Sequence, residues 1–171
     1  MVDSSLDDVK RCLAPVFSPE EVRRLSADNA LLARDVHGVS YLPGFVGLNN
    51  LTHTDYFNTV LHALSHVEPI RDFFLLPENY ANCRDSLVRQ FGCTLRKLWS
   101  RHNFKSVVSP QELLHEVTTA SQRRFEIGRK VSAPVALESM TSASRSASSC
   151  SSGWSQSSTA GCRGSGGGRL W

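Results

Sequence analysis

The stretch "GLNNLTHTDYFNTVLHAL", residues 47–64, joins a polar loop directly to the start of an amphipathic helix. From Asp55 onward, apolar residues recur at intervals of three and four, at Phe57, Val60, Leu61, Leu64 and Val67. This spacing predicts a helix from about Asp55 to Val67 that buries one face. A loop that opens into a helix in this way often presents a nucleophile at the helix start. Here that position holds a carboxylate, Asp55.

The rest of the first 130 residues predicts a mainly α fold. In "SPEE", Ser18 is the expected N-cap, Pro19 the first helical residue and Glu21 the partner in a capping box. Ser4 or Ser5 should cap the first helix, and "SPQE" at 109–112 repeats the cap signature. Alternation of apolar residues is too weak to predict a sheet. The expected helices cover roughly 5–13, 18–34, 55–67, 69–76, 85–99 and 109–121.

Composition changes sharply near residue 130, which divides the chain into a helical part, 1–130, and a tail, 131–171. The tail contains 13 Ser and 6 Gly and shows no helical or strand period. Such a segment cannot bury enough apolar surface to offset its ordering entropy, so we expect it to be disordered. Its single "SRS" leaves open a phosphorylation or RNA-contact segment, but a solvated tail is the simpler interpretation.

Charge, hydropathy and cysteine usage exclude several classes of protein. The net charge of +3 is too small to indicate nucleic-acid binding by itself. No apolar run approaches the roughly 20 residues that span a membrane, and the acidic N-terminus does not resemble a secretory signal. Five cysteines without a C-x-x-C pair argue against a zinc ribbon and for reduced thiols in the cytosol or nucleus. Cys12, Cys83 and Cys93 should be buried or half-buried apolar residues.

The loop and helix at 47–64 resemble the cysteine box of ubiquitin-specific proteases, G-L-x-N-x-G-N-T-C-Y-x-N-x-x-L-Q. The matching residues are Gly47, Leu48, Asn50, Thr54, Tyr56, Asn58 and Leu61. Asp55 stands at the cysteine position, and Thr52 and His53 replace the Gly-Asn pair. The motifs "YLPGFVGLNN", "LRKLW", "NFK" and "VSPQELL" are similar to a non-catalytic branch of the family that belongs to the spliceosomal tri-snRNP. The resemblance covers roughly residues 5–130.

This resemblance implies a papain-like fold in which the helices form the thumb. It also implies a nuclear protein without a cofactor that contacts tri-snRNP proteins in pre-mRNA splicing; whether ubiquitin still binds stays open. Asn50 matches the residue that serves the oxyanion hole in active relatives. Without an acyl intermediate, we expect Asn50 to hold the loop through side-chain to backbone hydrogen bonds. The catalytic His and Asp of the family would lie downstream of the matched region.

Residue 55 separates a protease from a docking protein on chemical grounds. The protease reaction needs a thiolate beside a histidine, favoured by a helix N-terminus. A carboxylate is a poor nucleophile toward an isopeptide carbonyl, and its charge would repel the developing oxyanion. Asp55 instead suits the first turn of a helix, where it interacts favourably with the helix dipole and can help to cap free N–H groups. We therefore expect no catalytic residue; a cysteine-type deubiquitinase is the alternative.

Two other groups of side chains offer weaker hypotheses of chemistry. Cys83, in the loop "NYANCRDS", and Cys93, within the helix at 85–99, lack a placed histidine, so a hidden thiol enzyme is disfavoured. His62 and His66 have the i, i+4 spacing that can hold a metal, but no third ligand is evident. We therefore expect no metal.

The stretch "LRKLWSRHNFK" interleaves cations with aromatic residues, a pattern found in RNA-binding proteins. Its cations are Arg96, Lys97, Arg101, His102 and Lys105. The alternative is a helix whose Leu95, Leu98 and Trp99 face the core while the cations face water, which the periodicity favours. In either case the cations are the most plausible contact surface for RNA or a protein partner. The resemblance implies that the palm of the papain-like fold would follow residue 130, where the Ser/Gly tail stands. We therefore also expect exposed apolar surface on the thumb helices and a tendency to self-associate.

Overall fold

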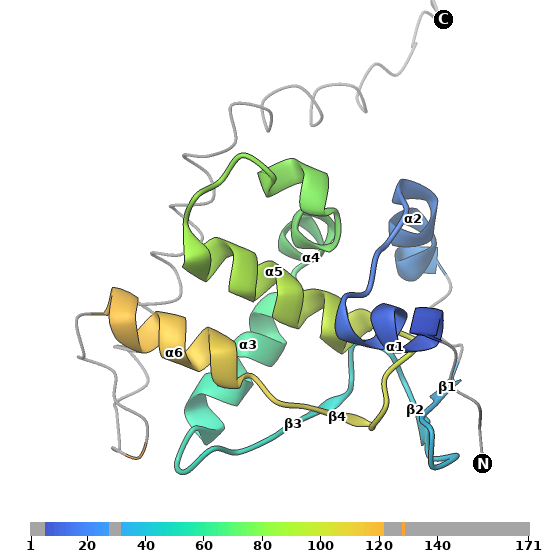
Figure 1. Ribbon diagram of the computed structural model, residues 1–171, viewed down its shortest axis with the longest axis horizontal. Helices are drawn as coiled ribbons and strands as arrows, with labels where there is room; N and C mark the ends of the chain where they lie inside the picture. Colours follow the sequence, from blue (N-terminus) through green and yellow to red (C-terminus); the bar gives the residue numbers. More distant parts are fainter. Residues whose placement is uncertain (1–5, 28–31, 122–127, 129–171) are drawn as a thin grey trace, which may run out of the picture.

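The computed structural model describes residues 6–27, 32–121 and 128, and it confirms the mainly α fold (Figure 1). The predictions for Ser4, Ser5 and the tail at 131–171 lie outside these residues. The helices are α1 (Leu6–Leu13), α2 (Pro19–Ala27), α3 (Asp55–Ser65), α4 (Glu68–Leu75), the 3-10 helix η1 (Pro77–Tyr80), α5 (Ser86–Trp99) and α6 (Gln111–Ala120). Four strands of two residues each are β1 (Ala33–Arg34), β2 (Ser40–Tyr41), β3 (Gly47–Leu48) and β4 (Val107–Val108).

Helix α5 forms the centre of the core and runs through the middle of the helical assembly in Figure 1. It packs against both α4 and α6, while α3 packs against α4. Leu95 and Leu98 are fully buried, and Trp99 is 1% exposed. The indole N–H of Trp99 donates to the carbonyl of Ser65 at 3.2 Å, which ties α5 to the end of α3. This burial confirms the apolar stripe that the sequence predicts for 85–99.

Helix α2 begins as predicted but ends earlier. The backbone N–H of Ser18 donates to Glu21 Oε2 at 2.7 Å, and the N–H of Glu21 donates to Ser18 Oγ at 3.2 Å, which completes the capping box. The predicted end at Arg34 is wrong, because α2 ends at Ala27 and Arg34 lies in β1. β1 pairs antiparallel with β2, so tertiary pairing overrides the local helix propensity of these residues.

The turn between β1 and β2 is organised by the carboxylate of Asp35. Its Oδ1 accepts hydrogen bonds from the backbone N–H groups of His37 and Val39, both at 2.9 Å, and its Oδ2 accepts from Ser106 at 3.2 Å. Burial alone would raise the pKa of this carboxyl, but the three donors outweigh it and hold the pKa below its ordinary value. Asp35 therefore joins the β1–β2 turn to the segment that precedes β4.

The second pairing, between β3 and β4, is parallel and joins residues far apart in the sequence. Gly47 lies opposite Val107 and Leu48 opposite Val108. This pair fixes the loop before α3 against the segment that leads into α6. The expected cap of that last helix is wrong, since Pro110 occupies the N-cap position of α6 and no side chain there makes a capping hydrogen bond.

Several large apolar side chains are exposed on this fold. Leu13, Val16 and Phe45 are among them, in the N-terminal part and the loop after β2. Val67, which the sequence predicts on the buried face of its helix, is also exposed, because α3 ends at Ser65 and Val67 lies in the turn before α4. Among the described residues, exposed apolar side chains are present as the sequence predicts, whereas self-association stays a prediction. Within the described residues, no helix combines the length and apolar character needed to cross a membrane.

Candidate functional site

The entrance to α3 is a loop held by Asn50. Its Oδ1 accepts hydrogen bonds from the backbone N–H of Thr54 at 2.9 Å and from Thr54 Oγ1 at 3.1 Å. Thr54 Oγ1 in turn accepts from the N–H of Leu51 at 2.9 Å. Thr54 is 1% exposed, so these bonds close a buried turn just before the helix. The amide of Asn50 is thus used inside the loop, as the side-chain to backbone interpretation expects.

The two residues between Leu51 and Thr54 have left-handed backbones. Thr52 has φ of 71° and His53 has φ of 53°. These positions correspond to Gly and Asn in the cysteine box, and those two residues tolerate positive φ better than other residues. A β-branched Thr in this conformation is strained. The loop therefore keeps the left-handed turn although its residues no longer favour it.

Asp55 is the first residue of α3, and its side chain is exposed. Within the described residues its carboxylate makes no hydrogen bond or ion pair; only its backbone carbonyl is engaged, by Thr59 Oγ1 at 2.9 Å. The N-cap residue is Thr54, which makes no side-chain capping bond. An exposed carboxylate at a helix N-terminus fits the dipole, but it supplies no polarisable nucleophile.

The described cysteines lie away from this entrance and have the burial that the sequence predicts. Cys83 is 1% exposed between η1 and α5. Cys93 is half-buried within α5, and Cys12 is half-buried in α1. None opens a helix, which is the setting that activates a thiol through the dipole.

The two histidines near the end of α3 are used in packing. His66 Nδ1 lies 2.8 Å from the carbonyl oxygen of His62, and the His66 ring contacts Phe45 and Trp99 at centroid distances of 4.6 and 5.5 Å. Burial, with a smaller contribution from His66, lowers the pKa of His62. Among the residues described, no three His, Cys, Asp or Glu side chains gather as a metal would need.

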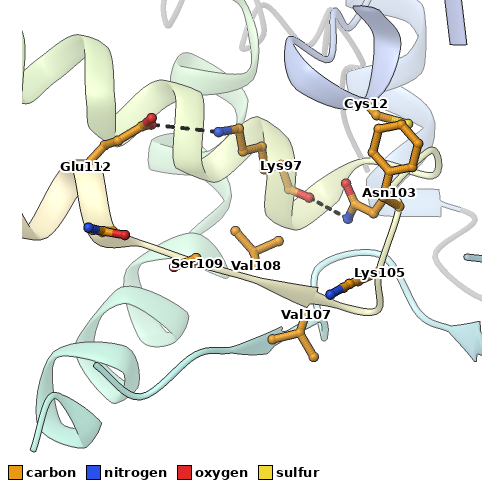
Figure 2. Close-up of a pocket in the computed structure, with 10 residues that line it drawn as sticks. Cys12, Lys97, Asn103, Lys105, Val107, Val108, Ser109 and Glu112 are labelled. Carbon is orange, nitrogen blue, oxygen red and sulfur yellow. Dashed lines mark hydrogen bonds and ion pairs between the residues drawn. The ribbon is translucent and has the colours of Figure 1, made fainter. Parts of the chain in front are cut away.

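The cations of the basic cluster at 96–105 do not share one surface but contact different parts of the fold. Arg96 donates to the hydroxyl of Tyr80 and its guanidinium lies 6.0 Å from that ring. Lys97 forms an ion pair with Glu112 of α6 at 3.8 Å, as Figure 2 shows. Arg101, like His102, is exposed beyond the end of α5 and faces α1 and α2.

Lys97 and Lys105 line a shallow pocket of about 370 Å³ between α5, β4 and α6 (Figure 2). No residue of α3 or its entrance lines this pocket, so it is separate from the position of the cysteine box. The backbone carbonyl of Lys97 also accepts from the side chain of Asn103 at 2.9 Å. Arg96 and Lys97 thus already have partners, and RNA contact by this cluster stays a prediction.

Sequence reasoning missed a second group of cations, in α1 and α2. Lys10, Arg11 and Arg24 lie beside Arg101 in a groove that the two helices form with the end of α5. Each lies in the last turn of its helix, a common place for a cation. The pairs "KR" and "RR" were the available signal, but their convergence depends on tertiary packing.

Comparison with known proteins assigns the class defined by this fold and helix entrance. The family model for ubiquitin carboxyl-terminal hydrolase matches residues 46–155. The chain belongs to this family, which confirms the resemblance seen in the cysteine box. The match begins at the strand before the Asn50 loop and extends beyond the described residues.

The relatives that match are named for splicing as well as for the hydrolase family. Human "Ubiquitin carboxyl-terminal hydrolase 39" is 42% identical over 137 residues, which cover 76% of this chain and 24% of that protein. "Probable mRNA-splicing protein ubp10" of Schizosaccharomyces pombe is 44% identical over 127 residues, covering 74% of this chain and 25% of that protein. The chain thus spans about a quarter of the length of these relatives.

A solved structure shows the same fold. "Crystal structure of an essential yeast splicing factor" superposes with a TM-score of 0.68, at 22% sequence identity, over 83% of this chain and 35% of that one. The partial coverage agrees with a region that forms only part of a larger fold.

Proposed function

We propose that this chain is a non-catalytic docking module of the nuclear splicing machinery that contacts tri-snRNP proteins. The observation that carries the proposal is Asp55, an exposed carboxylate at the helix position where the cysteine box of the family has its thiol. The relatives named for splicing support the same assignment.

The hydrogen bonds at the entrance to α3 support a loop that keeps its shape without a catalytic cysteine. Asn50 is bonded to Thr54 and closes a buried turn, so the loop is stable without a substrate. Thr52 puts a side chain where the box has Gly, and His53 replaces the Asn of the box with a larger side chain; both are exposed. We expect these side chains to narrow the space through which an extended peptide would approach the backbone of the loop.

The test is capture by ubiquitin that carries a C-terminal electrophile, followed by intact mass measurement. We expect the chain to stay unmodified, with an active family member as the positive control. Covalent capture of the wild-type chain would refute the proposal and support the deubiquitinase alternative.

The variant Asp55→Cys separates loss of the nucleophile from loss of ubiquitin binding. A small thiol reagent should label it, because residue 55 is exposed. If the ubiquitin electrophile also labels Asp55→Cys faster than it labels a Thr59→Cys control on the same helix, ubiquitin still binds. Equal rates would mean that it does not.

A further inference from the structure

A groove lies between α1, α2 and the end of α5. Its volume is about 840 Å³, within the range typical of ligand sites. In Figure 1 the end of α5 runs toward α1. The lining residues come from α1, the α1–α2 connection, α2 and the residues directly after α5. Leu25 is buried and Phe17 half-buried in its wall, while Val16 is 76% exposed at its rim. The groove therefore has an apolar wall beside its polar lining residues.

The charge of the groove is strongly one-sided. Lys10, Arg11, Arg24 and Arg101 line it, and Glu21 is the one acidic residue among the described residues of its lining. The carboxylate of Glu21 is already engaged by the backbone N–H of Ser18. Within the described residues Arg11, Arg24 and Arg101 make no ion pair, and the pair of Lys10 with Asp7 is a long 3.9 Å contact between exposed side chains.

A smaller cavity continues the positive charge. It has a volume of about 180 Å³, shares Arg11 and Arg101 with the groove, and adds Arg34 from β1. Asp35 lies in this cavity, but its oxygens accept backbone hydrogen bonds from three residues. The charge of Asp35 is therefore partly used within its own turn.

Helix dipoles account for only part of this arrangement. Cations in the last turn of a helix are stabilised by the helix dipole, which explains Lys10, Arg11 and Arg24 one helix at a time. It does not explain why these cations meet at one cavity together with Arg101 and an apolar wall. Unpaired like charges held close together cost free energy, and a bound anionic partner would remove that cost.

We propose that this groove binds an acidic peptide segment of a partner protein, with a bulky apolar side chain of the segment seated against Phe17 and Val16. The inference rests on the proposed function, for which it supplies the docking surface. Carboxylates would pair with Arg11 and Arg101, and the apolar side chain would cover the wall. RNA fits less well, because single-stranded RNA is held by exposed aromatic faces, and Phe17, the one Phe, Tyr or Trp among the described lining residues, is half-buried.

The probe is a short fluorescent peptide in which glutamates flank a central phenylalanine, titrated with the full chain at low salt. Two control ligands are the same peptide with serine at the centre and an oligouridine of equal charge. We expect saturable binding of the phenylalanine peptide, at least about threefold weaker binding of the serine peptide, and affinity that falls with added salt.

Matched variants locate the site. Arg101→Glu should weaken binding about tenfold, whereas Arg84→Glu makes the same charge change beyond the opposite end of α5 and should leave affinity unchanged. Val16→Ser should weaken binding of the phenylalanine peptide, and Val39→Ser, an exposed valine in the β1–β2 turn, should not. All four side chains are exposed, so an unchanged melting temperature will verify that each variant is folded.

Several outcomes would overturn the inference. They are absence of saturable peptide binding, equal affinity in Arg101→Glu and Arg84→Glu, or tighter binding of oligouridine that Arg101→Glu abolishes, which would assign the groove to RNA. None of these results bears on capture by the ubiquitin electrophile, so the failure of this inference and the failure of the proposed function are distinguishable.

Discussion

The substitution Gly92→Ala tests the packing of α5 against η1, because two effects of opposite sign compete there. Gly92 lies in the interior of α5, where Ala is favoured over Gly by about 0.8–1.0 kcal/mol. A Cβ at this position, however, would lie 2.6 Å from Cζ of Tyr80 and closer still to its hydroxyl. Local propensity alone thus predicts a more stable protein, and tertiary packing predicts a less stable one.

The free-energy cost of the steric clash outweighs the gain in helix propensity. Tyr80 is 6% exposed, and its hydroxyl donates to the carbonyl of Phe74 at 3.2 Å and accepts from Arg96. The ring cannot swing away without breaking these bonds. Overpacking costs about 1–3 kcal/mol and loss of the bond to Phe74 a further 0.5–1.5 kcal/mol or so. After the gain in propensity, we expect Gly92→Ala to lower the free energy of unfolding by roughly 2 kcal/mol.

Thermal and urea unfolding followed by circular dichroism measures this change. For a domain of this size, roughly 2 kcal/mol corresponds to a fall in Tm of about 10 °C. In the background of Tyr80→Leu, which lacks the ring atoms that the Cβ would meet, Gly92→Ala should be neutral or stabilising. A higher Tm for Gly92→Ala in the otherwise unaltered chain would refute the packing of Tyr80 on Gly92.

Three further outcomes are expected. The pKa of Asp35 is lower in the folded chain than its ordinary value near 3.8, so its stabilising contribution is present at neutral pH and disappears as pH falls through the folded pKa. Asp35→Asn should therefore reduce the fall of Tm below about pH 5. An unchanged dependence of Tm on acid pH would contradict this. Thr52→Gly should raise the free energy of unfolding by about 0.5–1 kcal/mol in urea titrations, because it relieves a left-handed Thr at some entropic cost; a loss of stability would show that the strain is absent. Leu95→Ala should destabilise by about 2–5 kcal/mol, whereas Leu13→Ala, which truncates a side chain that is 62% exposed, should change the same titration little; similar effects of the two would be inconsistent with a core centred on α5.

Periodicity and capping residues in the sequence predicted those helices whose formation depends on interactions within a few residues. The stripe of α5 follows from helical periodicity, and the start of α2 follows from Ser18 and Glu21, which bond within one turn. The error at Arg34 has a different origin. That residue pairs with Ser40 across a turn that Asp35 organises, and this pairing has no periodic signal in so short a strand.

The candidate site shows the same division. Asn50 and Asp55 were identifiable from the sequence, since the box fixes their order and spacing. The groove was not identifiable, because its cations lie far apart in the sequence, from Lys10 to Arg101. Each cation alone resembles an ordinary solvated residue. The dispersal of Arg96 toward Tyr80 and Lys97 toward Glu112 likewise depends on the placement of η1 and α6.

The sequence by itself determined which helices form and that a carboxylate stands at the entrance of α3, because caps, periodicity and residue identity act over a few neighbours. Only the tertiary structure decided that residues 33–34 form a strand, that β3 pairs with β4, and which cations share a groove. These features depend on contacts between distant segments, and burial of the core around α5 brings those segments together.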